Sequence, residues 1–380
     1  MKRNISNICL MLLPIIYIIL YEVYLFSNYM QHIEFITASF TILLFSLSIY
    51  LLGFRKNKLN ITMKNIKNLV ITHIVMYFAI IYGCGLLLGY LENGYSLQIG
   101  SIINNTFGPL ITIICIELFR YVFIKANTDK LTIIKIMTVI LIVFEFLLSI
   151  KLSNFNNIQN IFKIVTGTGL PIIMKNITMS YLSYHVGFQT TLLYRLVMDL
   201  YLYIVPIVPD LGDYINSILG VGLPFLIYLN SSKIIDEFNN GVEHEFLESC
   251  FGPHDLVIIG VIGCLTLLCS RMLPWYVIGV ASESMNPQIT KGDAVVIEKV
   301  KKPEDIKKGN VLSFYKEGKE IVHRFVEIEE KDGTICYITK GDANQTEDMG
   351  CLKFEDITGI VKVKIPYVAY PRVFLSEILG

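Results

Sequence analysis

The sequence predicts an α-helical polytopic membrane region followed by a small, mostly β domain. The 380 residues are 53% hydrophobic and only 17% charged, whereas soluble proteins usually carry about 25% charged residues. Charged residues are concentrated in the last hundred positions, where short β-type runs alternate with turns such as KGD and KDG. We therefore expect transmembrane helices over residues 1–254, a final membrane anchor over residues 255–276 and a β domain over residues 277–380.

The membrane region contains seven runs that approach the length needed to cross a bilayer, about 20 apolar residues. They cover residues 8–26, 36–54, 69–90, 108–123, 131–150, 215–229 and 256–273. The first lacks a small-residue cleavage site and further spans follow it, so it is not expected to be a removable signal peptide. The last ends in Trp275 and Tyr276, residue types found at membrane interfaces.

Basic residues predict the orientation of these helices. Residues 55–67 and 120–135 are rich in Lys and Arg, whereas residues 91–107 contain none, so the N-terminus and the two basic loops should be cytoplasmic. An odd number of crossings then places the β domain outside. Residues 192–208 contain Arg195 and Asp199, four positions apart, and we expect this segment not to cross and its charge pair to be structural. Seven crossings result.

Composition excludes several functions. The net charge is zero and no basic patch stands out, so nucleic acid is not an expected partner. Most of the eight cysteines lie in or beside apolar runs, and no metal-ligand spacing occurs, so neither a metal nor a cofactor is expected. Cys336 and Cys351 share the β domain and could form a bridge outside the cell, although free thiols are the simpler interpretation.

The β domain contains the residue types of a serine hydrolase, which needs a hydroxyl, a base, a group that orients the base and donors for the oxyanion. Of six histidines, only His323 lies in this domain. Four motifs occur in order: Ser282-Glu283-Ser284-Met285-Asn286-Pro287, Gly292-Asp293, Val322-His323-Arg324 and Thr339-Lys340-Gly341-Asp342, followed by Asp348. This pattern, over about residues 255–370, resembles the type I signal peptidase family. It is most similar to the branch of archaea, the endoplasmic reticulum and some spore-forming bacteria, which uses histidine where most bacterial members use lysine.

The resemblance implies a signal-peptidase-like catalytic domain with named roles. Ser284 matches the nucleophile, and its own backbone N–H would be one oxyanion donor. His323 matches the general base and Asp348 the carboxylate that holds it. Asp342 matches a second essential acid and is the second choice for the triad.

Three further residues near the serine are expected in the oxyanion and substrate region: Ser282, Met285 and Pro287. The hydroxyl of Ser282 would assist catalysis or only stabilise a turn. A Ser/Lys dyad remains an alternative, because three lysines lie between the serine and the histidine: Lys299, Lys301 and Lys302. An imidazole accepts a proton at neutral pH without heavy burial, which favours His323.

The resemblance also implies substrates and a location. The substrates would be secretory preproteins with small residues before the cleavage site, bound along strands near residues 278–282 and 321–325. The protein is expected in the cell membrane as a multi-pass protein with its catalytic domain on the extracytoplasmic side, in contact with the lipid bilayer and the secretion translocon. The alternatives are a scaffold or transporter with an inactive peptidase-like domain, and a self-cleaving regulator.

Overall fold

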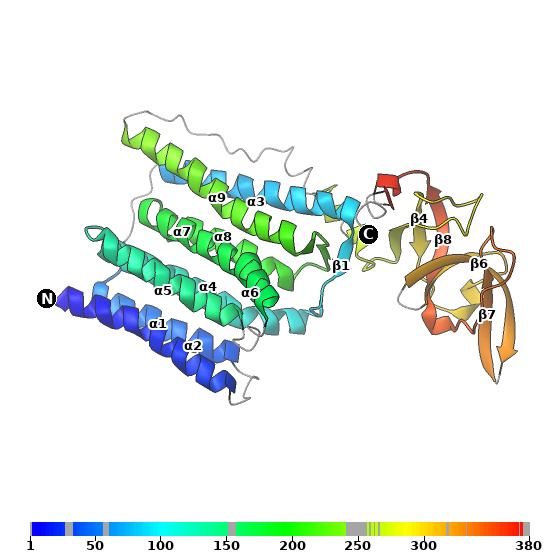
Figure 1. The fold of residues 1–380 in the computed structure, drawn as a ribbon, viewed down its shortest axis with the longest axis horizontal. Coiled ribbons are helices and arrows are strands. Elements are labelled where there is room, and N and C mark those ends of the chain that lie inside the picture. The colour runs from blue at the N-terminus through cyan, green and yellow to red at the C-terminus, as the bar shows by residue number, and fades with distance from the viewer. Residues whose placement is uncertain are drawn as a thin grey trace. The chain divides into compact units, whose positions relative to one another are not determined.

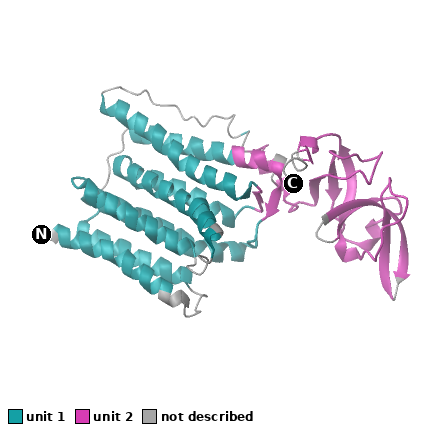
Figure 2. Cartoon of the chain, in the orientation of Figure 1, with its two compact units in different colours: residues 1–79, 93–205, 211–257 teal, residues 80–92, 206–210, 258–380 magenta. Residues whose placement is uncertain are grey.

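The computed structural model describes residues 2–26, 33–55, 61–150, 157–240, 257, 260–261, 263–264, 267–316, 319–331, 333–371 and 373–374. The chain divides into two compact units (Figure 2). Unit 1 comprises residues 1–79, 93–205 and 211–257, and unit 2 comprises residues 80–92, 206–210 and 258–380.

Unit 1 is a bundle of helices that lie side by side (Figure 1). The helices are α1 (Lys2–Phe26), α2 (Ile33–Leu52), α3 (Ile61–Leu88), α4 (Ile99–Ala126), α5 (Leu131–Ser149), α6 (Ile158–Ile164), α7 (Leu170–His185), α8 (Phe188–Leu200) and α9 (Gly212–Asn239). A π-helix, Val165–Gly169, joins α6 to α7, and a 3-10 turn, Tyr201–Tyr203, follows α8. One apolar cluster joins α1, α2, α4 and α5, and a second joins α3, α7, α8 and α9.

Six of the described helices are long and apolar enough to cross a membrane: α1, α2, α3, α4, α5 and α9. They coincide with the first six predicted runs, so the prediction of helices there is confirmed. The seventh predicted run, residues 256–273, is described only in part, and residues 241–254 before it lie outside the described residues.

Helices α7 and α8 form an antiparallel pair that the sequence did not predict. Within the described chain α8 is not among the candidate spans, yet its two ends reach opposite ends of the bundle. Lys125 Nζ, in the last turn of α4, donates to the carbonyl of Tyr184, just before the turn into α8 (2.8 Å). Asn93 Nδ2, before the start of α4, donates to the carbonyl of Val205, beyond α8 (2.7 Å). The stretch from Tyr184 to Val205 therefore extends between the two ends of α4, while the number of membrane crossings stays a prediction.

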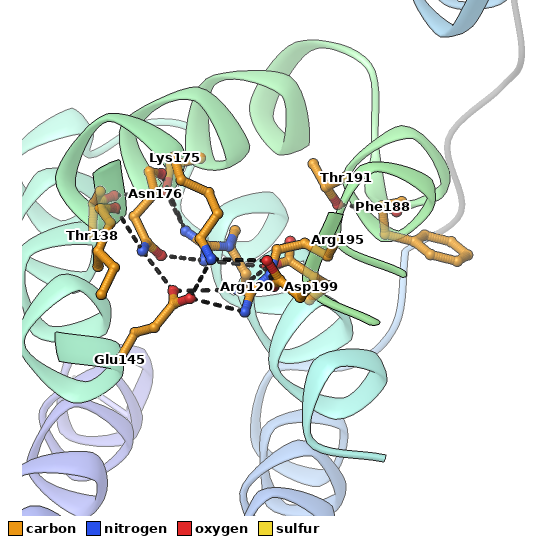
Figure 3. A network of polar contacts seen from close by, with 12 residues as sticks. Arg120, Thr138, Glu145, Lys175, Asn176, Phe188, Thr191, Arg195 and Asp199 are labelled. Atoms are coloured by element: carbon orange, nitrogen blue, oxygen red, sulfur yellow. Dashed lines mark hydrogen bonds and ion pairs between the residues drawn. The ribbon is translucent and has the colours of Figure 1, made fainter. Parts of the chain in front are cut away.

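Charged side chains hold α8 in the bundle (Figure 3). Arg195 Nε lies 2.5 Å from Asp199 Oδ2, as the four-residue spacing predicted. The same guanidinium contacts Glu145 on α5 (3.1 Å) and Glu117 on α4 (3.3 Å). Lys175 on α7 joins Glu145 (2.6 Å) to Asp199 (3.0 Å). The network has no formal net charge, because three bases balance three acids: Arg120, Lys175 and Arg195 against Glu117, Glu145 and Asp199.

Unit 2 contains a six-stranded antiparallel sheet. Its strands are β3 (Trp275–Gly279), β4 (Ala294–Glu298), β5 (Val311–Lys316), β6 (Lys319–Lys331), β7 (Thr334–Lys340) and β8 (Ile357–Ile365), in the order β3-β4-β8-β5-β6-β7. A separate two-stranded pair joins β1 (Tyr90–Glu92) to β2 (Ile207–Pro209). Strands β4 to β8 lie in the last hundred positions, where the sequence alternates short β-type runs with turns, which confirms a β-rich C-terminal domain.

Trp275 and Tyr276 were both expected at the membrane interface, but the structure places them differently. Trp275 and Tyr276 begin β3, where successive side chains point to opposite faces. Trp275 is 41% exposed, but Tyr276 is only 1% exposed and its hydroxyl donates to Glu320 Oε1 (3.1 Å). Tyr276 is therefore part of the core and is not an interfacial anchor.

Candidate active site

Ser284 lies in the loop between β3 and β4. Two backbone hydrogen bonds close the base of this loop, from Val280 N to Asp293 O (2.8 Å) and from Gly292 N to Val280 O (2.9 Å). Met285, the next residue, is only 1% exposed and packs in the core of the domain. The closed base and the buried neighbour fix the position of the serine.

His323 presents its imidazole to this serine from β6, where it pairs with Leu312 of β5. The side chain is 7% exposed. Its Nε2 lies 3.0 Å from Ser284 Oγ, and the edge of the Phe314 ring contacts the imidazole. An imidazole at this distance is placed to accept the serine proton.

The three lysines considered for a Ser/Lys dyad do not hydrogen bond to Ser284 Oγ in the described part of the chain. Lys299 Nζ donates to the carbonyl of Arg271, and Lys301 and Lys302 are exposed. Among the described residues, the side chains that hydrogen bond to Ser284 Oγ are His323 and Ser282, the latter at 3.2 Å.

Asp348 completes the chain of contacts, because its Oδ2 lies 2.5 Å from His323 Nδ1. Two bonds from Thr339, at the end of β7, hold this aspartate: Thr339 Oγ1 donates to Asp348 Oδ2 (2.7 Å), and Asp348 N donates to Thr339 O (2.8 Å). Burial would raise the pKa of Asp348, but the hydrogen bonds from His323 and Thr339 outweigh it, so the pKa is below its ordinary value. The sequence reasoning missed Thr339, although it stands in the motif that ends at Asp342.

A disulfide fixes the loop that carries Asp348. Cys336 on β7 is bonded to Cys351, three residues after the aspartate. Tyr337 N also donates to Leu352 O (2.8 Å). The simpler expectation of free thiols in this domain is therefore wrong, because the loop returns antiparallel to β7 and brings the two sulfurs together.

Asp342 binds Arg324 and does not contact the imidazole of His323. Its two carboxylate oxygens accept from Arg324 Nε (2.7 Å) and Arg324 Nη2 (2.6 Å). Arg324 also donates to Gly309 O (2.8 Å) and to Gln288. Of the two acids considered for the triad, only Asp348 reaches His323. The Asp342–Arg324 pair instead joins the β7 end to the β6 strand that carries His323.

Gly341, the residue before Asp342, packs closely against the backbone of Ser284. A Cβ at Gly341 would lie 2.7 Å from the carbonyl oxygen of Ser284, so any larger residue would displace the serine. Ala343 N donates to the same carbonyl (2.9 Å). Within the described part of the chain, the amide of Ser284 itself has no hydrogen-bond acceptor, as an oxyanion donor requires.

The three residues expected around the oxyanion and groove have different environments. Ser282 and Pro287 are exposed beside Ser284. The side chain of Met285 is buried in the core, so it does not line an open groove. The expectation for Met285 came from its position next to the serine, and local sequence does not reveal which way a loop side chain points.

Comparison with known proteins finds relatives among signal peptidase catalytic subunits. No model of a known protein family matches the chain. Curated relatives include the signal peptidase complex catalytic subunit SEC11C of Homo sapiens (31% identical), and the subunits named sec11 of Sclerotinia sclerotiorum (32%) and SEC11 of Komagataella phaffii (31%). Each match covers 27% of this chain, and it covers 57%, 66% and 67% of these relatives, respectively.

The chain thus spans little more than half the length of the human relative, and most of its own length has no counterpart in the matches. The six candidate spans agree with a membrane-associated protein. The ordered motifs around Ser284 and His323 and the similarity to the SEC11 subunits lead to one assignment: the chain belongs to the type I signal peptidase family, in the branch of the SEC11 catalytic subunits.

Proposed function

We propose that the protein is a membrane-bound serine endopeptidase that removes signal peptides from exported preproteins. The observation that carries the proposal is the unbroken chain of contacts from Ser284 Oγ to His323 Nε2 (3.0 Å) and from His323 Nδ1 to Asp348 Oδ2 (2.5 Å). The relatives are named as catalytic subunits of signal peptidase complexes, which supports signal peptides as the substrate class.

In this mechanism Ser284 Oγ attacks the scissile carbonyl carbon while its proton passes to His323 Nε2. The carbonyl oxygen becomes an oxyanion and accepts from the amide of Ser284. His323 then gives the proton to the leaving amine, the C–N bond breaks and an acyl-enzyme remains. Water, activated by the same imidazole, hydrolyses the ester and restores the serine. Asp348 keeps the imidazole in the correct tautomer and stabilises the imidazolium.

The proposed site of action is the extracytoplasmic face of the cell membrane. The Cys336–Cys351 disulfide supports this face, because disulfides persist in oxidising compartments. The concentration of basic residues in the sequence at residues 55–67 and 120–135, with none at residues 91–107, supports it too. The proposed partners are secretory preproteins with small residues before the cleavage site, the lipid bilayer and the secretion translocon.

The test is cleavage of a preprotein by the full-length protein in liposomes. Ser284→Ala should reduce the rate by at least about 10³-fold, as loss of a triad nucleophile does, whereas Ser217→Ala, at a partly exposed serine on α9, should retain it. An inactive wild-type protein would favour the scaffold alternative. Cleavage of its own chain with no cleavage of the preprotein would favour the self-cleaving regulator.

A further inference from the structure

A cavity of about 490 Å³ opens at one end of the helix bundle, within unit 1. Its walls come from Phe54, two residues beyond α2, the first turns of α3, the C-terminal part of α4 and the turn between α7 and α8. This volume is within the range of about 300–1,000 Å³ typical of ligand sites. The peptidase site described above lies in unit 2 and shares no residue with it.

One wall of the cavity is aromatic. The rings of Phe54, Tyr121 and Phe188 contact one another, with centroids 5.6 Å apart for Phe54 and Tyr121 and 5.2 Å apart for Tyr121 and Phe188. Met63 and Val186 extend the apolar surface. Gly187, at φ 115°, lets the chain turn between α7 and α8 without placing a side chain in the space. Such a wall suits hydrocarbon and not a polar metabolite.

The rim of the cavity is positively charged. Lys64 and Lys67 are exposed, line the cavity and, three positions apart, lie on one face of α3. No acidic residue is among the described lining residues, and neither lysine has an ion pair within the part of the chain that the structure describes. The charge of this rim therefore has no partner there and is complementary to an anion.

The surroundings of the cavity indicate where that anion comes from. Lys125, in the last turn of α4, and Arg55, after α2, lie at the same end of the bundle, where Tyr121 donates to the Arg55 carbonyl. A cavity with apolar walls and lysines at its rim is complementary to a phospholipid. The lysines would contact the phosphate, and the apolar walls would contact an acyl chain. Basic pockets between membrane helices bind acidic headgroups in this way.

We propose that this cavity binds one acidic glycerophospholipid, with its phosphate at Lys64 and Lys67 and the upper part of an acyl chain against Phe54 and Phe188. A soluble peptide or phosphorylated metabolite would satisfy the lysines but leave the aromatic wall exposed to water. The site gives the helical bundle a binding role that does not depend on peptidase activity.

The test uses the detergent-solubilised full-length protein and native mass spectrometry. Titration with phosphatidylglycerol should give a saturable one-to-one adduct, and phosphatidylcholine with the same chains should bind at least about tenfold more weakly. Lys64→Gln/Lys67→Gln should lower the phosphatidylglycerol affinity about tenfold, because basic residues beside an acidic headgroup attract it and solvent screens part of that attraction. Phe188→Ala should also weaken the adduct.

Lys135→Gln is the matched control, because Lys135 is an exposed lysine near the start of α5 that does not line the cavity. It should leave binding unchanged. Equal loss in this control, or equal binding of phosphatidylcholine, would overturn the proposal. Displacement of the lipid by inorganic phosphate at low millimolar concentration would instead assign the site to a soluble anion. Melting temperatures within about 2 °C of wild type, measured for each variant, would separate lost binding from lost folding.

Discussion

Thr339 Oγ1 and His323 Nδ1 donate to the same oxygen of Asp348, at 2.7 and 2.5 Å. The threonine therefore fixes the carboxylate that orients the imidazole, although it does not itself reach Ser284. In the proposed mechanism Thr339 is a positioning residue.

Replacing this threonine tests that role. Thr339→Val keeps the volume and removes the hydroxyl, and a hydrogen bond to a charged group is worth about 1.5–3 kcal/mol, so kcat should fall roughly 10- to 100-fold. Thr339→Ser should restore most of the rate. The acid limb of the pH–rate profile should move to higher pH in the valine variant, because the carboxylate loses one donor and attracts the imidazole proton more strongly. An unchanged limb with a lower melting temperature would indicate a purely structural role.

The two aspartates should behave differently on substitution. Asp348→Asn disrupts the contact with His323 and should lower kcat about 10³- to 10⁴-fold. Asp342→Asn weakens the bidentate contact with Arg324 and should chiefly reduce resistance to heat. In a double-mutant cycle with Arg324→Gln, residual activity after heating should show coupling between Asp342 and Arg324 and none between Asp348 and Arg324. A loss at Asp342 as large as that at Asp348, with unchanged heat resistance, would contradict this division of roles.

The pH dependence of the rate should reflect the imidazole and not the aspartate. The imidazole of His323 must be neutral to accept the serine proton, so kcat/KM should fall as the solution is made acidic. The pKa of Asp348 is lowered, so its ionised form persists as pH falls and is lost only below the ordinary range of an aspartate. Activity confined to alkaline pH would favour a lysine base instead.

Reduction of the disulfide should impair catalysis, because the Cys336–Cys351 bond holds the loop that carries Asp348. Dithiothreitol should lower the rate of the wild-type protein several-fold, and Cys336→Ser/Cys351→Ser should be slow with or without the reductant. The free cysteines within the described chain, such as Cys115, provide a control: Cys115→Ser should keep the wild-type response. A double variant with wild-type activity would show that the loop holds its shape without the bond.

The buried charge network should be essential for the helix bundle. Arg195→Leu leaves Glu117, Glu145 and Asp199 without their shared cation, and breaking a buried pair costs about 3–5 kcal/mol, so the yield and melting temperature of the full-length protein should fall sharply. Removing Asp199 as well should recover part of the loss. The exposed Lys163–Asp213 pair (3.3 Å) is the control, since Lys163→Leu should have little effect. Equal effects at the two sites would contradict a buried network.

The sequence alone determined the elements whose patterns are local. The apolar runs of α1 to α5 and α9 follow from hydrophobic length, and the strands β4 to β8 follow from short β-type runs separated by turn residues. Neither pattern needs tertiary context. Ser284, His323 and Asp348 were singled out for a similar reason, because motifs in a set order identify residues before any distance is known.

Tertiary structure decided everything that depends on a partner distant in the chain. Residues 192–208 were expected not to cross because they carry Arg195 and Asp199, and only the folded bundle brings further ions from α4, α5 and α7 to this pair. Asp342 and Asp348 were equivalent as carboxylates until folding placed one against Arg324 and the other against His323. The sequence also did not reveal that Tyr276 and Met285 are buried, that the disulfide forms or that Thr339 holds Asp348. Packing, and not the neighbours in the sequence, sets the direction of a side chain and the distance between residues far apart in the chain.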